Sequence, residues 1–382
     1  MMAAPASTSS AAASTAPPLP PALKGAPLAV DEVQGLVAQS MSGALTTIMV
    51  YLGDKLGLYK GLKDAGGPTT SAQLAARLGL SERWVREWLL QQASCRMVEC
   101  DGEAERYWLT RAQQDVLVNE EGPDASPYFF AGGGVLSLAD HRRALLDCFK
   151  TGVGMSYDQH GKSCAMGVKR ELGVWTRHFL VSKVAMLPGL KARLEAGAKV
   201  ADVGCGAGLA VCLLAAAFPN SEVHGYDISH HALEIAREDA KTQGLSNAHF
   251  HDCSTPEGVM PSDNSFDFIL VNDALHDMAH PELALAAIRK AIQPDGLFLI
   301  CDIKGLGAPA RNVEAHPMAA MMYGFSVACC MSSALSEPGG LGLGTLGFHR
   351  EVAERMVREA GFAGFEPLDW QSDMNAYYLV RP

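Results

Sequence analysis

The stretch Lys199-Val200-Ala201-Asp202-Val203-Gly204-Cys205-Gly206-Ala207-Gly208 joins an apolar run to an acid and to three glycines at alternate positions. An apolar segment follows from Leu209 to Phe218. This order predicts a strand, a tight turn and a helix, because glycine adopts the positive φ values that such a turn requires. The free N–H groups at the helix start then face any ligand that lies against the turn. We therefore expect a nucleotide-like ligand at the carboxyl end of the first strand of an open α/β sheet.

The spacing of the glycines discriminates between nucleotide ligands. The dinucleotide fingerprint is G-x-G-x-x-G/A, whereas here the third glycine comes one place early, at Gly208. The carboxylate of Asp202, just before the glycines, would also repel a pyrophosphate at close range. It suits a ligand with an ammonium group and no phosphate, such as S-adenosylmethionine. An NAD-dependent oxidoreductase is disfavoured on both grounds.

The segment Asp202–Gly208 resembles motif I of class I methyltransferases, in which the glycines pack under the methionine and ribose of S-adenosylmethionine. Asp227 ends the second predicted strand, at the distance that fits one βαβ unit, and its carboxylate can accept both ribose hydroxyls. Asp252 and Cys253 end the third predicted strand, where the family holds an acid that meets the adenine amino group. The expected cofactor-binding residues are Asp202, Gly204, Gly206, Gly208, Asp227, Ile228, Asp252, Cys253 and Asn272.

The composition narrows the range of partners. The chain has 382 residues, enough for two domains, and a net charge of −11, so neither nucleic acid nor an anionic membrane is an expected partner. No apolar run approaches the ~20 residues of a membrane-spanning helix. The ten cysteines show neither a C-x-x-C pair nor zinc-ligand spacing, so we expect no metal and reduced thiols in a cytoplasmic protein.

The N-terminal third divides into a tail and a small domain. Residues 1–28 are mostly Ala, Pro, Ser and Thr and predict a disordered tail. The tail lacks the arginines of a typical transit peptide, although organelle import stays open. Apolar residues from Val33 to Leu52 then recur at three- and four-residue steps, which predicts a helix. This stripe is more apolar than a lone surface helix needs, so a second domain covers it or it pairs with another subunit, and we expect a homodimer.

Residues 29–120 predict a winged helix. Thr70–Gln73 fits a capping box, and Ser81 can cap a second helix whose apolar face is Trp84, Val85, Trp88 and Leu89. Two strands follow, at 97–100 and 106–110. From Asp31 to Glu120 there are nine Lys and Arg against twelve Asp and Glu, whereas DNA binding needs a basic face. A dimerisation and lid domain is therefore favoured over DNA binding.

The rest of the chain predicts a connection and a Rossmann-like domain. Residues 121–195 hold two glycine-rich loop signals, Gly132–Gly134 and Thr151–Gly154, among aromatic residues, and we interpret them as a linker with lid helices. Residues 196–382 predict a mostly parallel seven-stranded sheet, with an insertion at 304–348 that is rich in methionine and aromatic residues. The expected substrate-pocket residues are Met155, Tyr157, Trp175, Met322 and Tyr323.

From Asp31 onward the layout resembles two-domain small-molecule methyltransferases of mycobacteria and eukaryotes and, more distantly, the caffeate-type plant O-methyltransferases. Leu275-His276-Asp277 matches the His-Asp pair of the plant enzymes, in which the histidine is the catalytic base. Asp302 falls where those enzymes carry an acid that orients this histidine. Their second orienting acid follows a Pro-Gly-Gly, but no acid follows Pro338-Gly339-Gly340 here, a departure from the plant mechanism and its phenolic substrate.

These patterns predict methyl transfer from S-adenosylmethionine to a small acceptor, through oxygen. His276 is the expected base, with an ordinary imidazole pKa near roughly 6.5 that suits neutral pH. Asp302 is expected to hold its ring, and Asp277 to point away or to cap the following helix. The same histidine could instead only close the pocket floor. The alternative function is a winged-helix regulator that binds S-adenosylmethionine without turnover.

Overall fold

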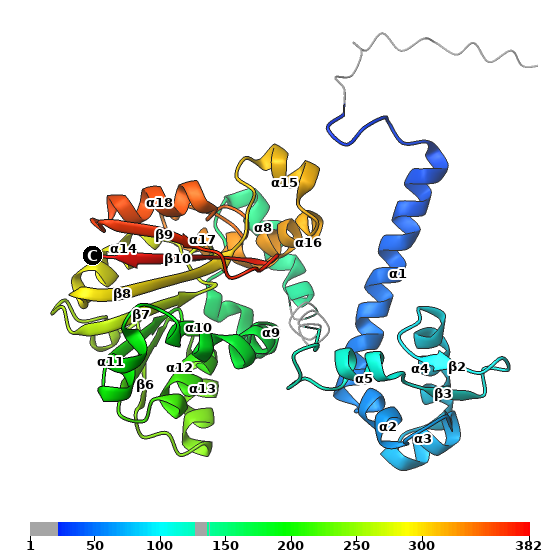
Figure 1. Cartoon of the computed structure of the whole chain (residues 1–382). Coiled ribbons are helices and arrows are strands. Elements are labelled where there is room, and N and C mark those ends of the chain that lie inside the picture. The colour runs from blue at the N-terminus through cyan, green and yellow to red at the C-terminus, as the bar shows by residue number, and fades with distance from the viewer. Residues whose placement is uncertain (1–21, 127–135, 137) are drawn as a thin grey trace, which may run out of the picture.

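The computed structural model describes residues 22–126, 136 and 138–382. It contains a large α/β body and a smaller, mainly helical body formed by the N-terminal part of the chain (Figure 1). Most of the predicted tail and the predicted loop Gly132–Gly134 lie outside the described residues.

The large body is built on a seven-stranded sheet, with the strand order β6-β5-β4-β7-β8-β10-β9. The first five strands in this order run parallel and β10 runs antiparallel to both of its neighbours, so the predicted fold class is confirmed. Strand order reverses between β4 and β7, and ligands of open α/β sheets bind at the carboxyl ends of such a pair. The strands are β4 (Lys199–Val203), β5 (Glu222–Asp227), β6 (Ala248–Asp252), β7 (Phe266–Asn272), β8 (Ile292–Ile303), β9 (Gly364–Leu368) and β10 (Asn375–Arg381).

Helices cover both faces of this sheet, which explains why its central strands are apolar on both sides. In β7, Ile269 and Val271 pack into the core on one face, while Phe268 and Leu270 pack into the core on the other. The helices are α12 (Leu209–Ala217), α13 (His230–Thr242), α14 (Pro281–Ala291) and α18 (Arg350–Glu359). Strand β8 begins at Ile292, and its register with β7 is irregular between Phe266 and Phe268.

The segment predicted as a linker belongs partly to the large body. It contains α8 (Arg142–Thr151), α9 (Gly161–Trp175), a π-helical turn (Thr176–Leu180), α10 (Val181–Ala185) and α11 (Leu190–Ala196). Leu180, Val184 and Leu190 are fully buried in the core on one face of the sheet, so the end of this segment packs with the large body, and the predicted domain start at 196 stays a prediction. Arg170 on α9 forms ion pairs with both Asp54 and Glu120 and so ties this helix to the N-terminal body.

The insertion at 304–348 is helical and lies beside the carboxyl edge of the sheet. It contains α15 (Pro309–Ala315), α16 (Ala319–Phe325), a second π-helical turn (Ser326–Cys330) and α17 (Met331–Ala334). Single π-helical turns inside α-helices occur frequently at functional sites. Among the residues that the structure describes, two such turns occur, one between α9 and α10 and one between α16 and α17.

The small body is a winged helix with one more strand than predicted. Its elements are α2 (Leu58–Asp64), β1 (Thr69–Thr70), α3 (Ser71–Leu78), α4 (Glu82–Ser94), β2 (Glu99–Cys100), β3 (Arg106–Trp108) and α5 (Arg111–Leu117). The capping box is confirmed, because the Thr70 side chain accepts a hydrogen bond from the Gln73 N–H and the Gln73 side chain accepts one from the Thr70 N–H. Two details were wrong. Ser81 precedes α4 without a side-chain cap bond, and Trp84 is 80% exposed because it lies off the buried face.

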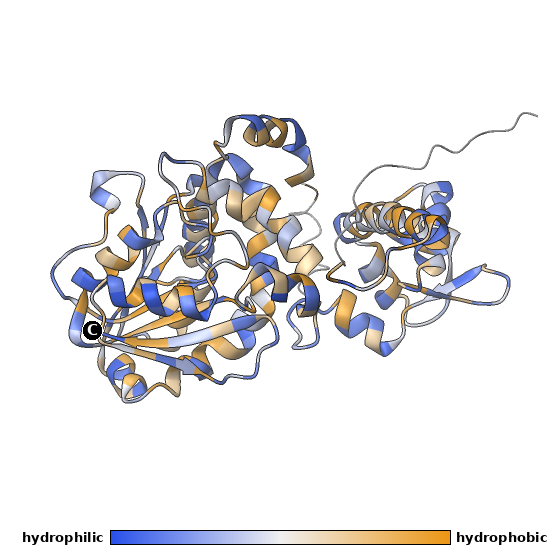
Figure 2. Ribbon diagram, turned by 90° about the horizontal axis from the view of Figure 1, so that it is seen from above, coloured by the Kyte–Doolittle hydropathy of each residue, from blue (hydrophilic) through white to orange (hydrophobic). Residues whose placement is uncertain are grey.

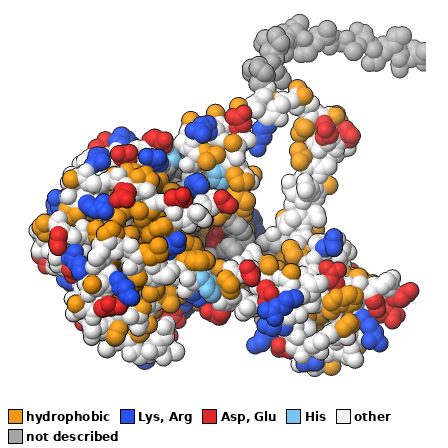
Figure 3. Space-filling model, in the orientation of Figure 1, with side chains coloured by type: hydrophobic (Ala, Val, Ile, Leu, Met, Phe, Trp, Pro, Cys, Tyr) orange, Lys and Arg blue, Asp and Glu red, His pale blue; other side chains and the backbone are white. Residues whose placement is uncertain are grey.

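Helix α1 (Val30–Lys55) packs on the small body with its C-terminal part, where Val50 is buried, while its N-terminal part extends away from the rest of the molecule (Figures 1 and 3). Figure 2 views it nearly along its axis and shows hydrophobic residues on it without cover from the large body. Its length and composition alone would allow it to cross a bilayer, which the sequence analysis overlooked because Ser, Thr and Gly interrupt the apolar residues. The exposed hydrophobic residues are Val30, Val33, Leu36, Val37, Met41, Leu45, Ile48 and Leu52.

Candidate active site

Two cavities of about 350 and 380 Å³ lie at the carboxyl edge of the sheet. Each is large enough for a small molecule. We call the first the donor cavity and the second the acceptor cavity. Both are lined by Tyr157, Val168, Leu172, Asp273 and Asp277, so the two cavities adjoin.

The glycine turn after β4 forms the floor of the donor cavity. Gly204, Gly206 and Gly208 have φ values of 76°, 52° and 72°, which L side chains rarely adopt. A Cβ on Gly206 would meet no atom within 4 Å and would project into open space beside the turn. The bare backbone of Gly206 therefore leaves room for a ligand.

Two buried carboxylates face this cavity. Asp202 is 2% exposed, and its Oδ1 has no hydrogen-bond partner. Burial, followed by the nearby charge of Asp227, raises the pKa of Asp202 to about 8. Asp227 accepts hydrogen bonds from the Gly206 N–H at 2.7 Å and the Ser229 N–H at 2.8 Å, and each oxygen retains a lone pair for a ligand. A cationic ligand with hydroxyl groups would satisfy both acids.

Most of the predicted cofactor residues line the donor cavity. They are Asp202, Gly204, Gly206, Asp227, Ile228, Cys253 and Asn272. The two other predicted residues, Gly208 and Asp252, do not line it. A Cβ on Gly208 would lie 2.6 Å from both Ala236 and Phe250, so this glycine permits helix packing and does not face the ligand.

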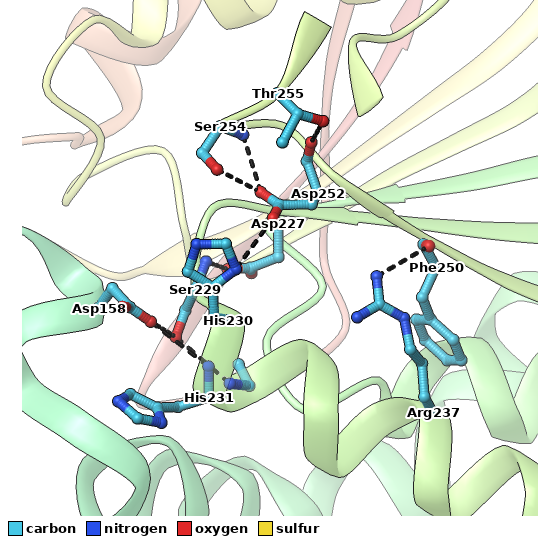
Figure 4. A network of polar contacts seen from close by, with 11 residues as sticks. Asp158, Asp227, Ser229, His230, His231, Arg237, Phe250, Asp252, Ser254 and Thr255 are labelled. Carbon is cyan, nitrogen blue, oxygen red and sulfur yellow. Dashed lines mark hydrogen bonds and ion pairs between the residues drawn. The ribbon is translucent and has the colours of Figure 1, made fainter. Parts of the chain in front are cut away.

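Asp252 also lies outside the donor cavity, against the expectation that it meets adenine. Figure 4 shows its side chain held by the Ser254 backbone and hydroxyl and by His230 at 2.9 Å. The same view shows an acid that the sequence did not indicate. Asp158 accepts from the Ser229 hydroxyl at 3.0 Å and so links the segment before α9 to the loop after β5.

These groups fit S-adenosylmethionine. Asp202 offers an unpartnered buried oxygen to an ammonium group, Asp227 offers lone pairs to ribose hydroxyls, and Gly206 leaves space along the main chain. The carboxylates of Asp202 and Asp227, which both line this cavity, would repel the phosphates of a dinucleotide.

The acceptor cavity contains the predicted catalytic pair. His276 is 3% exposed and Asp302 is fully buried, and the distance from His276 Nδ1 to Asp302 Oδ1 is 2.7 Å. His276 lines the cavity, whereas Asp302 lies behind it at the end of β8. Because a carboxylate accepts only, Asp302 holds the proton on Nδ1 and leaves Nε2 for other contacts.

One of these contacts is a cysteine that the sequence analysis did not select. Cys330 lies in the π-helical turn Ser326–Cys330, and its Sγ lies within 4.8 Å of a ring nitrogen of His276. Burial alone would lower the pKa of His276, but Asp302 and Cys330 outweigh it and raise this pKa well above 6.5. Hydrogen bonding from Cys329, together with His276, lowers the pKa of the Cys330 thiol well below its usual value. The raised pKa departs from the ordinary imidazole value that was expected, because Asp302 and Cys330 both lie close to the ring.

Three further acids line the acceptor cavity. Asp277 was expected to point away or to cap a helix, but its side chain lines both cavities. Asp273 has a φ of 59°, uncommon for a residue with a side chain, and its Oδ1 is buried without a partner. Glu171 reaches the cavity from α9. The segment after β7 therefore carries three site residues, of which the sequence analysis selected only His276.

The predicted substrate-pocket residues separate into two groups. Tyr157, Trp175 and Met322 line the acceptor cavity. Met155 does not line it, because it is buried where its N–H donates to the Ser332 hydroxyl. Tyr323 also lies outside the cavity, where its hydroxyl meets Asn312 at 3.4 Å.

Two overlapping sets of possible metal ligands share His276. One adds Asp277 and Cys330, the other adds Asp273 and Asp302, and the ligand atoms within each set lie within 4.8 Å of one another. These residues come from separate segments, so no regular spacing reveals them in the sequence. The expectation that the chain binds no metal stays a prediction.

Comparisons with known proteins agree with this geometry. A methyltransferase domain family matches residues 194–342, and an Rv2258c-like winged HTH domain family matches residues 44–119. The chain is 28% identical over 207 residues to methyltransferase GfsG of Streptomyces halstedii, covering 52% of this chain and 71% of that protein. It is also 28% identical over 123 residues to the UbiE C-methyltransferase of Burkholderia multivorans, covering 32% of this chain and half of that protein.

Solved structures with the same two-domain fold cover nearly the whole chain. A candidate O-methyltransferase from Nostoc punctiforme superimposes with a TM-score of 0.68 at 18% identity and covers 91% of this chain and 99% of its own. Human N-acetylserotonin methyltransferase in complex with S-adenosylmethionine gives a TM-score of 0.64 at 16% identity, covering 93% and 99%. At these identities the likeness shows the fold.

The chain is therefore a class I methyltransferase with a winged-helix domain at its N-terminus. It is an S-adenosylmethionine-dependent enzyme. The predicted enzyme class and cofactor are confirmed, and the alternatives of an NAD oxidoreductase and a regulator without turnover are not supported.

Proposed function

We propose that this enzyme methylates a hydroxyl oxygen of a small molecule bound in the acceptor cavity, with His276 as the general base. The observation that carries the proposal is the contact of 2.7 Å between His276 and the buried Asp302, at the wall of a cavity that adjoins the donor cavity. Methylation of oxygen is supported by neighbours such as the mitomycin 7-O-methyltransferase MmcR, which has the same fold.

The chemistry required of the chain is limited. The bound S-adenosylmethionine supplies a methyl group that its sulfonium has already activated. The residues of the acceptor cavity then need only align the hydroxyl and remove one proton. Tyr157, Asp273 and Asp277 belong to both cavities, so an acceptor in the second lies beside a donor in the first.

The contact between Cys330 and His276 sets a condition on this mechanism. In the free enzyme the raised pKa of His276 favours the protonated ring at neutral pH, beside a thiol whose lowered pKa favours the thiolate. The ring must release this proton to solvent before it can act as a base, and the acceptor hydroxyl then takes the place of Cys330 and gives its own proton to the free ring nitrogen. The rate should therefore rise with pH above the ordinary range of histidine.

The test is product identification. The protein is incubated with methyl-labelled donor and the small-molecule fraction of a cell extract, and the labelled product is identified by mass spectrometry and NMR. The proposal predicts a new O–CH₃ group. A methyl group on carbon or nitrogen, or no transferred label in any fraction, would contradict it.

We also propose that the chain forms a homodimer through α1. Val33, Met41 and Leu45 are about half exposed or more on this helix, and a second copy would cover them. Light scattering on the full chain should give twice the chain mass of 40.6 kDa. A monomer at micromolar concentration would contradict the dimer, and flotation of that monomer with lipid vesicles would assign α1 to a bilayer.

We further propose that the winged helix does not bind nucleic acid. In α4, the position of a recognition helix, Arg83 pairs with Glu87 and Arg86 pairs with Glu82. Both arginines therefore face carboxylates of the same helix. A gel-shift assay with random duplex DNA at low salt should show no complex.

A further inference from the structure

Glu171 is a carboxylate that the proposed reaction does not use. It lies on α9, lines the acceptor cavity and does not line the donor cavity. Its side chain has no hydrogen-bond or ion-pair partner within the described part of the chain. A carboxyl group in such a place is costly to ionise unless a ligand compensates it.

The cavity around Glu171 contains an excess of acid. Asp273 and Asp277 line it as well, while His276 is already paired with Asp302. The described residues that line the cavity include no Lys or Arg. The sequence of residues 127–137 contains no Lys or Arg either.

Glu171 and Asp273 line the same cavity, and Asp273 Oδ1 is buried there without a hydrogen-bond partner. Burial, followed by the charge of Asp273, raises the pKa of Glu171 to about 8. A cation bound between them would stabilise both ionised forms.

The positive charge of the methyl donor cannot compensate all three acids, Glu171, Asp273 and Asp277. Asp273 and Asp277 line both cavities, so a sulfonium in the donor cavity lies within reach of them. Of these two cavities, Glu171 lines only the acceptor cavity, so a ligand that compensates its charge would be the acceptor.

The remaining walls suit an apolar body that carries a cation. Tyr157, Trp175, Phe179 and Phe325 line the same cavity, and aromatic faces attract ammonium groups as well as flat rings. We propose that the methyl acceptor carries a protonated amine, and that Glu171 and Asp273 bind its ammonium group. This rests on the proposed function in taking the second cavity as the acceptor site.

The test compares three probes of one shape and different charge. Tyramine is a cation, 4-ethylphenol is neutral and 4-hydroxyphenylacetate is an anion. Each is titrated by calorimetry into the full-length protein saturated with S-adenosylhomocysteine. Tyramine should bind at least about tenfold more tightly than 4-ethylphenol, and the anion should bind most weakly.

The variant Glu171→Gln keeps the shape and hydrogen-bonding capacity of the side chain and removes its charge. It should lower the affinity for tyramine about tenfold or more and leave the affinity for 4-ethylphenol unchanged. Glu238→Gln is the matched control, because Glu238 is exposed on α13 outside both cavities, and it should change neither affinity. A melting temperature equal to that of the wild type, measured with saturating S-adenosylhomocysteine, would show that both variants are folded.

Several outcomes would overturn the ammonium site. In the wild type they are equal binding of tyramine and 4-ethylphenol, binding of the anion that is tighter than that of tyramine, or no binding of tyramine. In the variant Glu171→Gln the contradicting outcome is an affinity for tyramine equal to that of the wild type. The test separates this inference from the proposed reaction. If tyramine binds through Glu171 but receives no methyl group on oxygen, only the O-methylation is contradicted. If the enzyme methylates neutral hydroxyl compounds without preference for a cation, only the ammonium site is contradicted.

Discussion

The donor and acceptor cavities adjoin, yet the chain builds them in different ways. The donor cavity takes its main polar groups from short segments at the ends of successive parallel strands, with Asp202 after β4 and Asp227 after β5. The acceptor cavity takes its polar groups from segments far apart in the sequence, with Glu171 on α9, His276 after β7 and Cys330 in the insertion. The donor cavity therefore depends mainly on the sheet and its strand ends, whereas the acceptor cavity combines a loop after β7 with helices packed beside the sheet.

This difference predicts that substitutions in the two cavities have different effects. Substitutions in the donor cavity should abolish binding of S-adenosylmethionine and therefore all activity. Substitutions in the acceptor cavity should leave donor binding intact and change the rate or the choice of acceptor.

The largest effect is expected from Asp227→Ala. Its carboxylate accepts two backbone N–H groups in the free protein and is expected to accept ribose hydroxyls in the complex. Loss of two charge-assisted hydrogen bonds, each worth about 1.5–3 kcal/mol, should weaken donor binding about 10²–10⁴-fold. Calorimetry with S-adenosylhomocysteine measures this, and NAD should not bind either protein.

The matched control for this variant is Asp252→Ala. Asp252 also ends a parallel strand, but its side chain faces His230 and Ser254 rather than the donor cavity (Figure 4). Donor affinity should therefore change little. A loss as large as that of Asp227→Ala would place Asp252 at the adenine, as the resemblance to the family implies.

The next effect is expected from His276→Ala. Removal of a general base lowers kcat by about 10²–10⁴-fold. Donor affinity should be unchanged, because His276 lines only the acceptor cavity. His349→Ala, which removes an imidazole outside both cavities, is the control. An unchanged turnover in His276→Ala would mean that alignment alone drives the reaction and that the histidine only closes the pocket.

A smaller effect is expected from Asp302→Asn, because this residue orients the base and does not touch the acceptor. The Asp302 carboxylate is one of the groups that raise the pKa of His276, so its neutralisation should lower that pKa. The base acts in its deprotonated form, so the acidic limb of the profile of kcat against pH should move to lower pH while kcat falls less than in His276→Ala. A limb that stays in place would show that another group titrates.

The sequence was sufficient for the sheet and for most of the donor cavity, because both depend on local patterns. Strand ends and glycines at fixed spacing identify Asp202 and Asp227 without knowledge of the tertiary fold. Gly208 and Asp252 do not line the donor cavity, and a local pattern does not show which way a residue faces.

The acceptor cavity could be predicted only in part. His276 and Asp302 follow strands and were found, but Cys330 and Glu171 come from helices whose approach to the sheet is a tertiary event. The adjacency of Asp273 and Asp277 to His276 was a usable signal, since all three sit in one short loop after β7. The pKa of His276 could not be read from sequence, because it depends on groups that only the fold brings together.

The most direct test of the two-cavity account is a crystal structure of the protein with S-adenosylhomocysteine. The account predicts the amino group at Asp202, the ribose on Asp227 and the sulfur facing the wall formed by Asp273 and Asp277, which leads to His276. A ligand elsewhere, or a sulfur that faces away from the acceptor cavity, would contradict it.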